Sequence, residues 1–208
     1  MDFLDHEHFQ VSADGVEYHP LKPFLPSNTV VLFLGSFPPP RQRWCMDFFY
    51  PNFLNDHWRM EGLVFFGDSK HFVDVTKKSF RLPEIVNFLQ EKGIGFYDTA
   101  TAVRRLKANA SDQFLEIVQT TDIPALLQQI PQCRVVVTTG EKATATFCGH
   151  MGISPLPAIG KPVCIPAATG LPQPLYLYRL PSTSRAYPLS LGKKAEAYEK
   201  MFRFAGLV

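Results

Sequence analysis

The segment Thr29–Leu34 (TVVLFL), followed at once by Gly35–Pro40 (GSFPPP), decides the fold of this 208-residue chain. A short, nearly continuous apolar run that ends in glycine and proline is typical of a strand buried on both faces of a parallel sheet. Two further runs share this character, Arg134–Thr138 (RVVVT) and Leu175–Leu180 (LYLYRL), and Ile94–Thr99 is a weaker fourth. The sequence therefore predicts four short strands.

The segments between these strands have the spacing of helices. Apolar residues lie three and four positions apart in Leu82–Lys92 and Ile123–Gln129, and a single apolar stripe marks a helix near Leu191–Ala205. Strands that alternate with helices favour a parallel sheet with right-handed crossovers and helices on both faces. We therefore expect an α/β fold, and nothing in the sequence divides residues 1–208 into more than one domain.

Composition restricts the function only weakly. The chain is 46% hydrophobic and 19% charged, which is typical of a globular protein, and its net charge of +2 is too small to indicate a polyanionic partner. The acidic N-terminal residues and the absence of a long apolar run predict a cytoplasmic protein without a membrane segment. Four widely spaced cysteines without a CxxC pair predict free thiols and neither a metal site nor an iron–sulfur cluster; they are Cys45, Cys133, Cys148 and Cys164.

Each predicted strand leads into an unusual segment. These segments are Gly35–Pro40, Asp98–Arg105 (DTATAVRR), Thr139–Ala143 (TGEKA) and Pro181–Arg185 (PSTSR). Ligands of open α/β sheets bind outside the carboxyl ends of the strands. We therefore expect the four segments to converge on one site.

The residue types near these strand ends suit a nucleic acid. Trp44–Asn52 and Asn55–Arg59 interleave aromatic rings with amides and carboxylates, which can stack on an unstacked base and hydrogen-bond to its edge. Pro181–Arg185 offers three hydroxyl groups and a guanidinium, which suit phosphates, although a helix cap and turn would use the same residues. The sequence therefore predicts a base-binding site.

From about Val30 to Phe204 the chain resembles the uracil-DNA glycosylase superfamily, most closely its mismatch-specific uracil/thymine branch. The resemblance rests on the order of five motifs. These are Gly35-Ser36-Phe37-Pro38 (glycine, any residue, acid or amide, proline), Asn55-Asp56-His57-Trp58 (Asn-x-Phe-Trp), Gly93–Thr99 (the glycine-rich second strand), Val136–Ala143 (the third strand, its glycine and the next helix) and Leu180–Arg185 (the Pro-Ser minor-groove loop).

The resemblance implies a three-layer sandwich with a short, mainly four-stranded parallel sheet flanked by helices. It also implies a monomeric, cofactor-free enzyme that flips uracil or a related damaged base from DNA and hydrolyses the N-glycosidic bond. By the same resemblance, Phe48 or Phe49 stacks on the base, and the backbone of Gly35, Ser36, Phe37 and Pro38 contacts it. Pro181, Ser182, Thr183, Ser184 and Arg185 hold the DNA phosphates.

The chain departs from the family at the acid or amide of the first motif, where it has Phe37. A phenyl ring can neither orient water nor stabilise an oxocarbenium-like sugar, so a carboxylate elsewhere must do so. Asp47 is the first candidate because it precedes Phe48 and Phe49, although it could equally form a salt bridge with Arg41 or Arg43. Asp98, at the end of the second strand, is the second candidate.

A hydrogen-bond donor would stabilise the charge on the departing base, and His57 and Asn55 are candidates. Two other functions stay open. The absence of the usual catalytic residue is compatible with a DNA-binding or damaged-base-binding protein that does not hydrolyse its ligand. Alternatively, Ser182–Arg185 could hold the phosphate of a free nucleotide in a nucleoside or nucleotide hydrolase.

Overall fold

A computed structural model of the chain describes residues 2–5, 11–107, 112–167, 171 and 173–208. Its central sheet has five strands in the order β5-β2-β8-β10-β9. The bounds are Val31–Gly35 for β2, Ile94–Asp98 for β5, Val135–Thr139 for β8, Pro162–Ile165 for β9 and Leu175–Leu180 for β10. The four predicted strands are confirmed and parallel, while β9 joins the edge antiparallel to β10.

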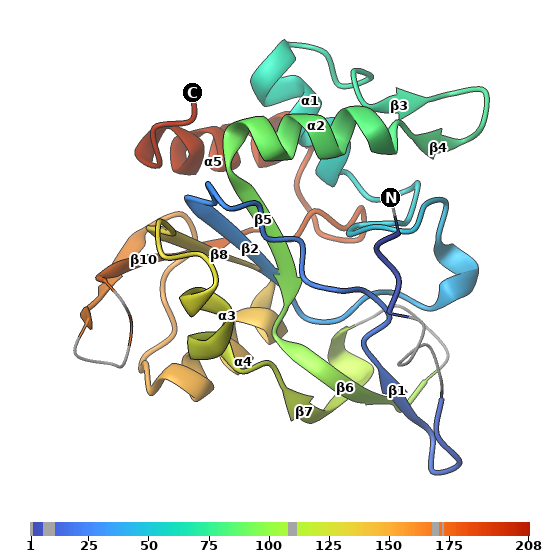
Figure 1. Cartoon of the computed structure of the whole chain (residues 1–208). Helices are drawn as coiled ribbons and strands as arrows, with labels where there is room; N and C mark the ends of the chain where they lie inside the picture. Colours follow the sequence, from blue (N-terminus) through green and yellow to red (C-terminus); the bar gives the residue numbers. More distant parts are fainter. Residues whose placement is uncertain (1, 6–10, 108–111, 168–170, 172) are drawn as a thin grey trace.

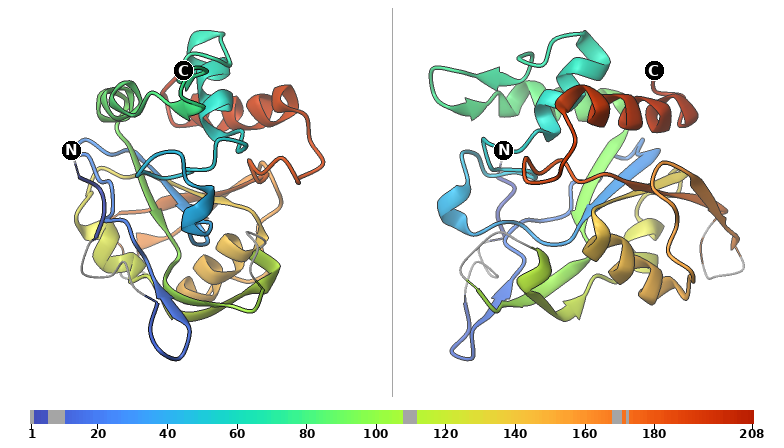
Figure 2. Two further views of the ribbon diagram at one scale, coloured as in Figure 1. Left: turned by 90° about the vertical axis from the view of Figure 1, so that its right-hand side faces the viewer. Right: turned by 180° about the vertical axis from the view of Figure 1, so that it is seen from behind.

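Helices cover both faces of this sheet (Figures 1 and 2). One layer contains α1 (His57–Phe66), α2 (Leu82–Lys92) and α5 (Leu191–Phe204), and the other contains α3 (Ile123–Gln128) and α4 (Glu141–Met151). Strands β2, β5 and β8 are buried along almost their whole length because both faces are covered, which explains their apolar sequences. The three-layer α/β fold is therefore as the sequence predicted.

A second, smaller sheet lies beside the first and was not predicted. It pairs β1 (Val16–Tyr18), β6 (Ala100–Arg105) and β7 (Leu115–Thr120) in antiparallel order β1-β6-β7. Thr99 alone separates β5 from β6, so the chain passes directly from one sheet into the other. The segment Asp98–Arg105, expected as a site loop, is therefore mostly a strand, and only its first residues reach the sheet edge.

The remaining elements are short: β3 (Val73–Asp74) pairs with β4 (Ser79–Phe80), and single 3₁₀ turns cover Arg41–Arg43 (η1) and Asp112–Phe114 (η2). All four cysteines are free thiols; Cys133 and Cys148 are buried, Cys45 is half-buried and Cys164 is exposed. In the described part of the chain no helix has both the length and the apolarity needed to cross a membrane.

Candidate active site

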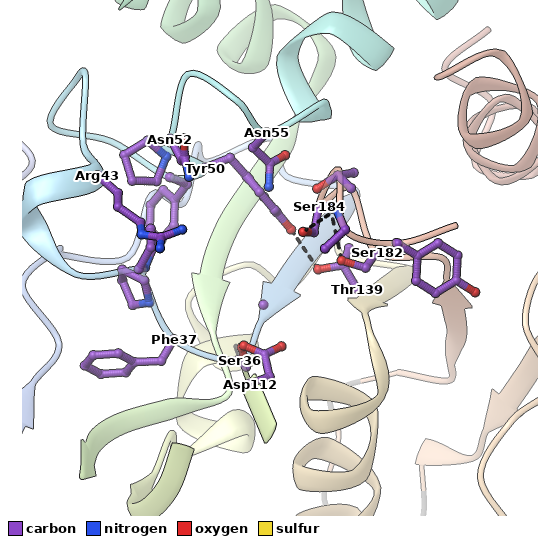
Figure 3. A pocket seen from close by; sticks show the side chains of 18 of the residues that line it. Ser36, Phe37, Arg43, Tyr50, Asn52, Asn55, Asp112, Thr139, Ser182 and Ser184 are labelled. Carbon is purple, nitrogen blue, oxygen red and sulfur yellow. Dashed lines mark hydrogen bonds between the residues drawn. The ribbon is translucent and has the colours of Figure 1, made fainter. Parts of the chain in front are cut away.

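An open cavity of about 630 Å³ lies at the carboxyl ends of β2, β5 and β8. This volume is in the range of pockets that bind small organic groups. Figure 3 shows residues from distant parts of the chain around it. The lining includes rings of Phe37, Phe49, Tyr50 and Tyr187, amides of Asn52, Asn55 and Gln113, carboxyls of Asp98 and Asp112, hydroxyls of Ser36, Thr139, Ser182, Thr183 and Ser184, and Arg43.

Asp98, the last residue of β5, is a buried carboxylate at the wall of this cavity. Its Oδ2 lies 2.8 Å from Nε2 of His19, whose ring is also buried. Because an ionised carboxylate can only accept a hydrogen bond, Nε2 of His19 is the donor to Asp98. The Leu21 N–H and carbonyl oxygen lie 3.2 and 2.9 Å from Nδ1 on the other side of the ring. His19 therefore fixes the position of the Asp98 carboxylate.

Gly35 leaves the space that this carboxylate occupies. Gly35 and Asp98 are register partners in β2 and β5, and a methyl group on Gly35 would overlap Asp98 Oδ1. The Thr99 N–H and hydroxyl both donate to the Gly35 carbonyl, at 2.9 and 3.0 Å, which holds the two strand ends together. The glycine is therefore required here for space beside a carboxylate.

A second carboxyl group, that of Asp112 in η2, lies in the same cavity. The Ser36 hydroxyl donates to its Oδ1 at 2.8 Å, and Figure 3 shows the two side chains together at the end of β2. Burial, and to a smaller extent the charge of Asp98, raises the pKa of Asp112, while the Ser36 hydrogen bond opposes the rise. The cavity thus combines the Asp98 carboxylate, which accepts a hydrogen bond from His19, with Asp112, whose raised pKa means that it binds its proton more tightly than an ordinary aspartate.

Tyr50 forms an aromatic wall of the cavity and has an unusual backbone, with φ of 49°. Its ring stacks on His57 with centroids 3.8 Å apart and planes 4° apart, and its hydroxyl lies 2.8 Å from Thr139 Oγ1 (Figure 3). Burial raises the pKa of the Tyr50 phenol above its usual range, so the ring stays neutral. A residue held in a left-handed conformation at a cavity is typical of a functional position.

Ser182–Ser184, here named the hydroxyl loop, follows β10 and borders the cavity. Asp56, which precedes α1, fixes this loop: its N–H donates to the Thr183 carbonyl at 3.0 Å. The Asp56 carboxylate accepts from Lys194 Nζ at 2.9 Å and from Arg185 Nε at 3.2 Å, and Lys194 Nζ also donates to the Ser184 carbonyl at 2.8 Å. Lys194 is fully buried, so these partners take the place of water around its amino group.

Most of the residues predicted from the sequence do line the cavity. Gly35, Ser36, Phe37, Pro38, Phe49, Asn55, Asp98, Ser182, Thr183 and Ser184 belong to it. The ring of Phe37 packs into a small core with Ala100, Val103 and Leu115, under the Arg105 guanidinium.

Five predicted residues lie outside the lining of this cavity. Asp47 is half exposed, pairs with Arg41 and borders a separate surface hollow. Of the two salt bridges that the sequence allowed for Asp47, with Arg41 or with Arg43, the structure contains the one with Arg41. Phe48 is fully buried against Phe24 and Trp58.

His57 lies buried beneath Tyr50, with Nε2 2.9 Å from Glu61 Oε1. Pro181 is buried, and its carbonyl accepts from Tyr198 at 2.8 Å. Arg185 lies outside the cavity lining and bonds Asp56.

Sequence reasoning singled out none of His19, Tyr50, Asn52, Asp112 and Thr139 individually, although it placed Thr139 in one of the four converging segments; the structure brings all five to the site. His19 and Asp112 carry no signal because the segments around them match no motif. For Tyr50 and Asn52 a signal existed, since both belong to the aromatic and amide run that was singled out.

Among the described residues, no three His, Cys, Asp or Glu side chains are grouped so that they could hold a metal ion. No protein-family model matches the chain, and no curated protein matches it either.

A solved structure does match the fold. It is the solution NMR structure of a protein described as a "putative Uracil DNA glycosylase" from Methanosarcina acetivorans. The two chains are 22% identical, the match covers 92% of this chain and 99% of the other, and the TM-score is 0.59. The chain therefore shares the three-layer α/β fold of that protein.

Proposed function

We propose that this chain is a DNA glycosylase of the uracil-DNA glycosylase superfamily, which takes an extruded uracil or related damaged base into its cavity and hydrolyses the N-glycosidic bond. The observation that carries the proposal is the buried Asp98 carboxylate, held by His19 in a cavity that also offers stacking rings and amides. The shared fold with the Methanosarcina acetivorans protein supports it. The motifs that resemble the mismatch-specific branch add mismatched thymine to the candidate bases.

In this proposal the groups of residues that line the cavity have different roles. Phe49 and Tyr50 provide the aromatic surface beside the base, and Asn52 and Asn55 read its edge. Asp98 stabilises the oxocarbenium-like sugar and directs water to its anomeric carbon. The hydroxyl loop and Arg43 contact the flanking phosphates at the cavity mouth.

Base release from DNA is the direct test. The purified protein is incubated with end-labelled oligonucleotides that carry one uracil, hypoxanthine or mismatched thymine, treated with alkali and run on a denaturing gel. We expect alkali-dependent cleavage at the modified position and none in the same sequence with ordinary base pairs. The strands should stay intact without alkali, since a monofunctional glycosylase leaves an abasic site.

Two results would overturn the proposal. Binding in a shift assay without cleavage of any substrate would indicate a DNA-binding protein. Equal hydrolysis of free deoxyuridine and of the same base in a long oligonucleotide would indicate a nucleoside hydrolase, since such an enzyme gains nothing from DNA on either side.

Gly35→Ala is expected to lower the rate of base release by about 100-fold, because the added methyl group displaces the Asp98 carboxylate from its position beside His19. The single-turnover rate on the preferred oligonucleotide measures the effect. Gly149→Ala is the matched control, since a methyl group at Gly149 of α4 meets no atom within 4 Å. Equal rates for the two variants would contradict the role given to Gly35.

A further inference from the structure

Two carboxyl groups share the cavity, and their surroundings differ. Asp98 accepts a hydrogen bond from the His19 N–H at 2.8 Å. Asp112 is bound by the Ser36 hydroxyl, a neutral group that can partner either form of the carboxyl. Burial and the nearby charge of Asp98 both raise the pKa of Asp112, which favours the protonated form of this carboxyl group.

The cations nearest to Asp112 are engaged elsewhere. Lys142 Nζ, on α4, donates to the Leu115 carbonyl at 2.9 Å. Arg105, on β6, donates through Nε to Glu17 at 2.9 Å and through Nη2 to the Pro38 carbonyl at 2.5 Å. Both lower the pKa of Asp112 from a distance, but burial outweighs them and the net direction is upward. Among the described residues, further titratable groups near Asp112 are Asp98 with its partner His19, and Tyr50, whose phenol stays neutral. Arg43 and Tyr187 also line the cavity.

We propose that Asp112 is the general acid that protonates the departing base, an assignment that rests on the proposed glycosylase function. The C1′–N bond breaks and its electron pair leaves with the base, which takes the carboxyl proton of Asp112. Water adds to C1′ and gives its proton to Asp98, which returns it to solvent, and solvent reprotonates Asp112. The net reaction consumes one water and yields the free base and an abasic site.

The surroundings of Asp112 also suit the anion that forms after proton transfer. Lys142 and Arg105 favour its negative charge. A methyl group on Gly140 would lie 3.9 Å from its Oδ2, and Gly140 is the N-cap of α4. A helix N-terminus stabilises an adjacent negative charge. Asp112 thus has a raised pKa before the step and cationic surroundings that favour its carboxylate after it, as a proton donor requires.

The pH dependence and the leaving group test this assignment. With a proton donor of raised pKa, the wild-type single-turnover rate falls as pH rises through the pKa of Asp112, because the proton is then lost. Asp112→Asn is expected to lower the rate by about 100-fold at low pH and to remove this alkaline fall. Asp47→Asn, at an exposed aspartate outside the cavity, is the matched control and should keep the wild-type profile.

A better leaving group needs less help from an acid. The loss in Asp112→Asn should therefore shrink to less than about tenfold with 5-fluorouracil in place of uracil, or with xanthine in place of hypoxanthine if a purine is released. For the same reason the alkaline fall of the wild-type protein should be weaker with the better leaving group. That comparison needs no variant and decides the question even if Asp112→Asn does not fold.

The outcomes separate this inference from the function on which it depends. Wild-type base release with the same loss in Asp112→Asn for both leaving groups would overturn the role of Asp112 alone, as would an alkaline fall that persists in the variant. Failure of the wild-type protein to release any base would overturn the proposed function itself, and the general acid with it.

Discussion

Asp98→Asn is expected to reduce base release by about 1,000-fold or more while DNA binding stays within a fewfold of the wild-type value. The amide oxygen can still accept the hydrogen bond from His19, so the side chain keeps its place and shape. What it loses is the negative charge that stabilises the oxocarbenium-like sugar, and removing one such preorganised interaction costs roughly 100- to 1,000-fold in rate. Loss of the general base for water adds to this.

Asp47→Asn is the matched control because it makes the same chemical change at an exposed aspartate that pairs with Arg41 outside the cavity. Its single-turnover rate should stay within about twofold of the wild-type rate, in line with the small energetic value of an exposed ion pair. The reverse pattern, with Asp47→Asn inactive and Asp98→Asn active, would return the catalytic role to Asp47. Full activity in both would mean that neither aspartate is catalytic.

Lys194→Ala is expected to lower the free energy of unfolding by about 3–5 kcal/mol, because it leaves Asp56 buried without its closest cation. For a chain of this size the melting temperature should fall by roughly 10 °C. Thermal or urea unfolding followed by circular dichroism measures the change. The hydroxyl loop should also loosen, since the Ser184 carbonyl loses its partner.

Lys193→Ala is the control, because Lys193 is exposed and pairs only with Glu196 on its own helix among the described residues. It should change the unfolding free energy by less than about 0.5 kcal/mol. The double variant Asp56→Asn with Lys194→Met should recover part of the loss, since the unpaired buried charge is gone. If Lys193→Ala and Lys194→Ala melted alike, the buried ion pair would not be what holds the loop.

The elements that the sequence predicted correctly are those whose pattern is local. Strands β2, β5, β8 and β10 lie within one or two residues of the predicted runs, and α2 has the predicted bounds. Burial on both faces makes such strands apolar throughout, and packing on one face gives a helix its apolar stripe. Each pattern can be read in a single window of sequence.

The second sheet was missed because its strands gain stability from partners far along the chain. Strand β6 mixes buried and half-exposed residues without strict alternation and follows β5 after one residue. The sequence was therefore interpreted as one strand followed by a loop. Its pairing with β1 depends on residues almost 90 positions earlier, such as Val16 opposite Arg104. The edge strand β9 begins at Pro162, a residue that argues against a strand unless it lies at an edge.

The site was also only partly predictable, because local patterns are visible in the sequence and long-range contacts are not. Convergence of strand ends placed Gly35, Asp98 and the hydroxyl loop together. It could not reveal His19, which meets Asp98 across 79 residues. Nor could it decide which ring of Phe48, Phe49 and Tyr50 faces the cavity, since that depends on the left-handed backbone at Tyr50.

The link from Asp56 to Lys194 joins residues 138 positions apart. During synthesis, which proceeds from the N-terminus, the ribosome releases Asp56 long before α5 emerges. Until then the carboxylate has no ammonium partner and the hydroxyl loop has no anchor on α5. A nascent chain can form β2, β5 and their helices, yet it acquires a complete cavity only when α5 docks. The complete cavity, and with it the proposed action on DNA, thus forms only after α5 has docked.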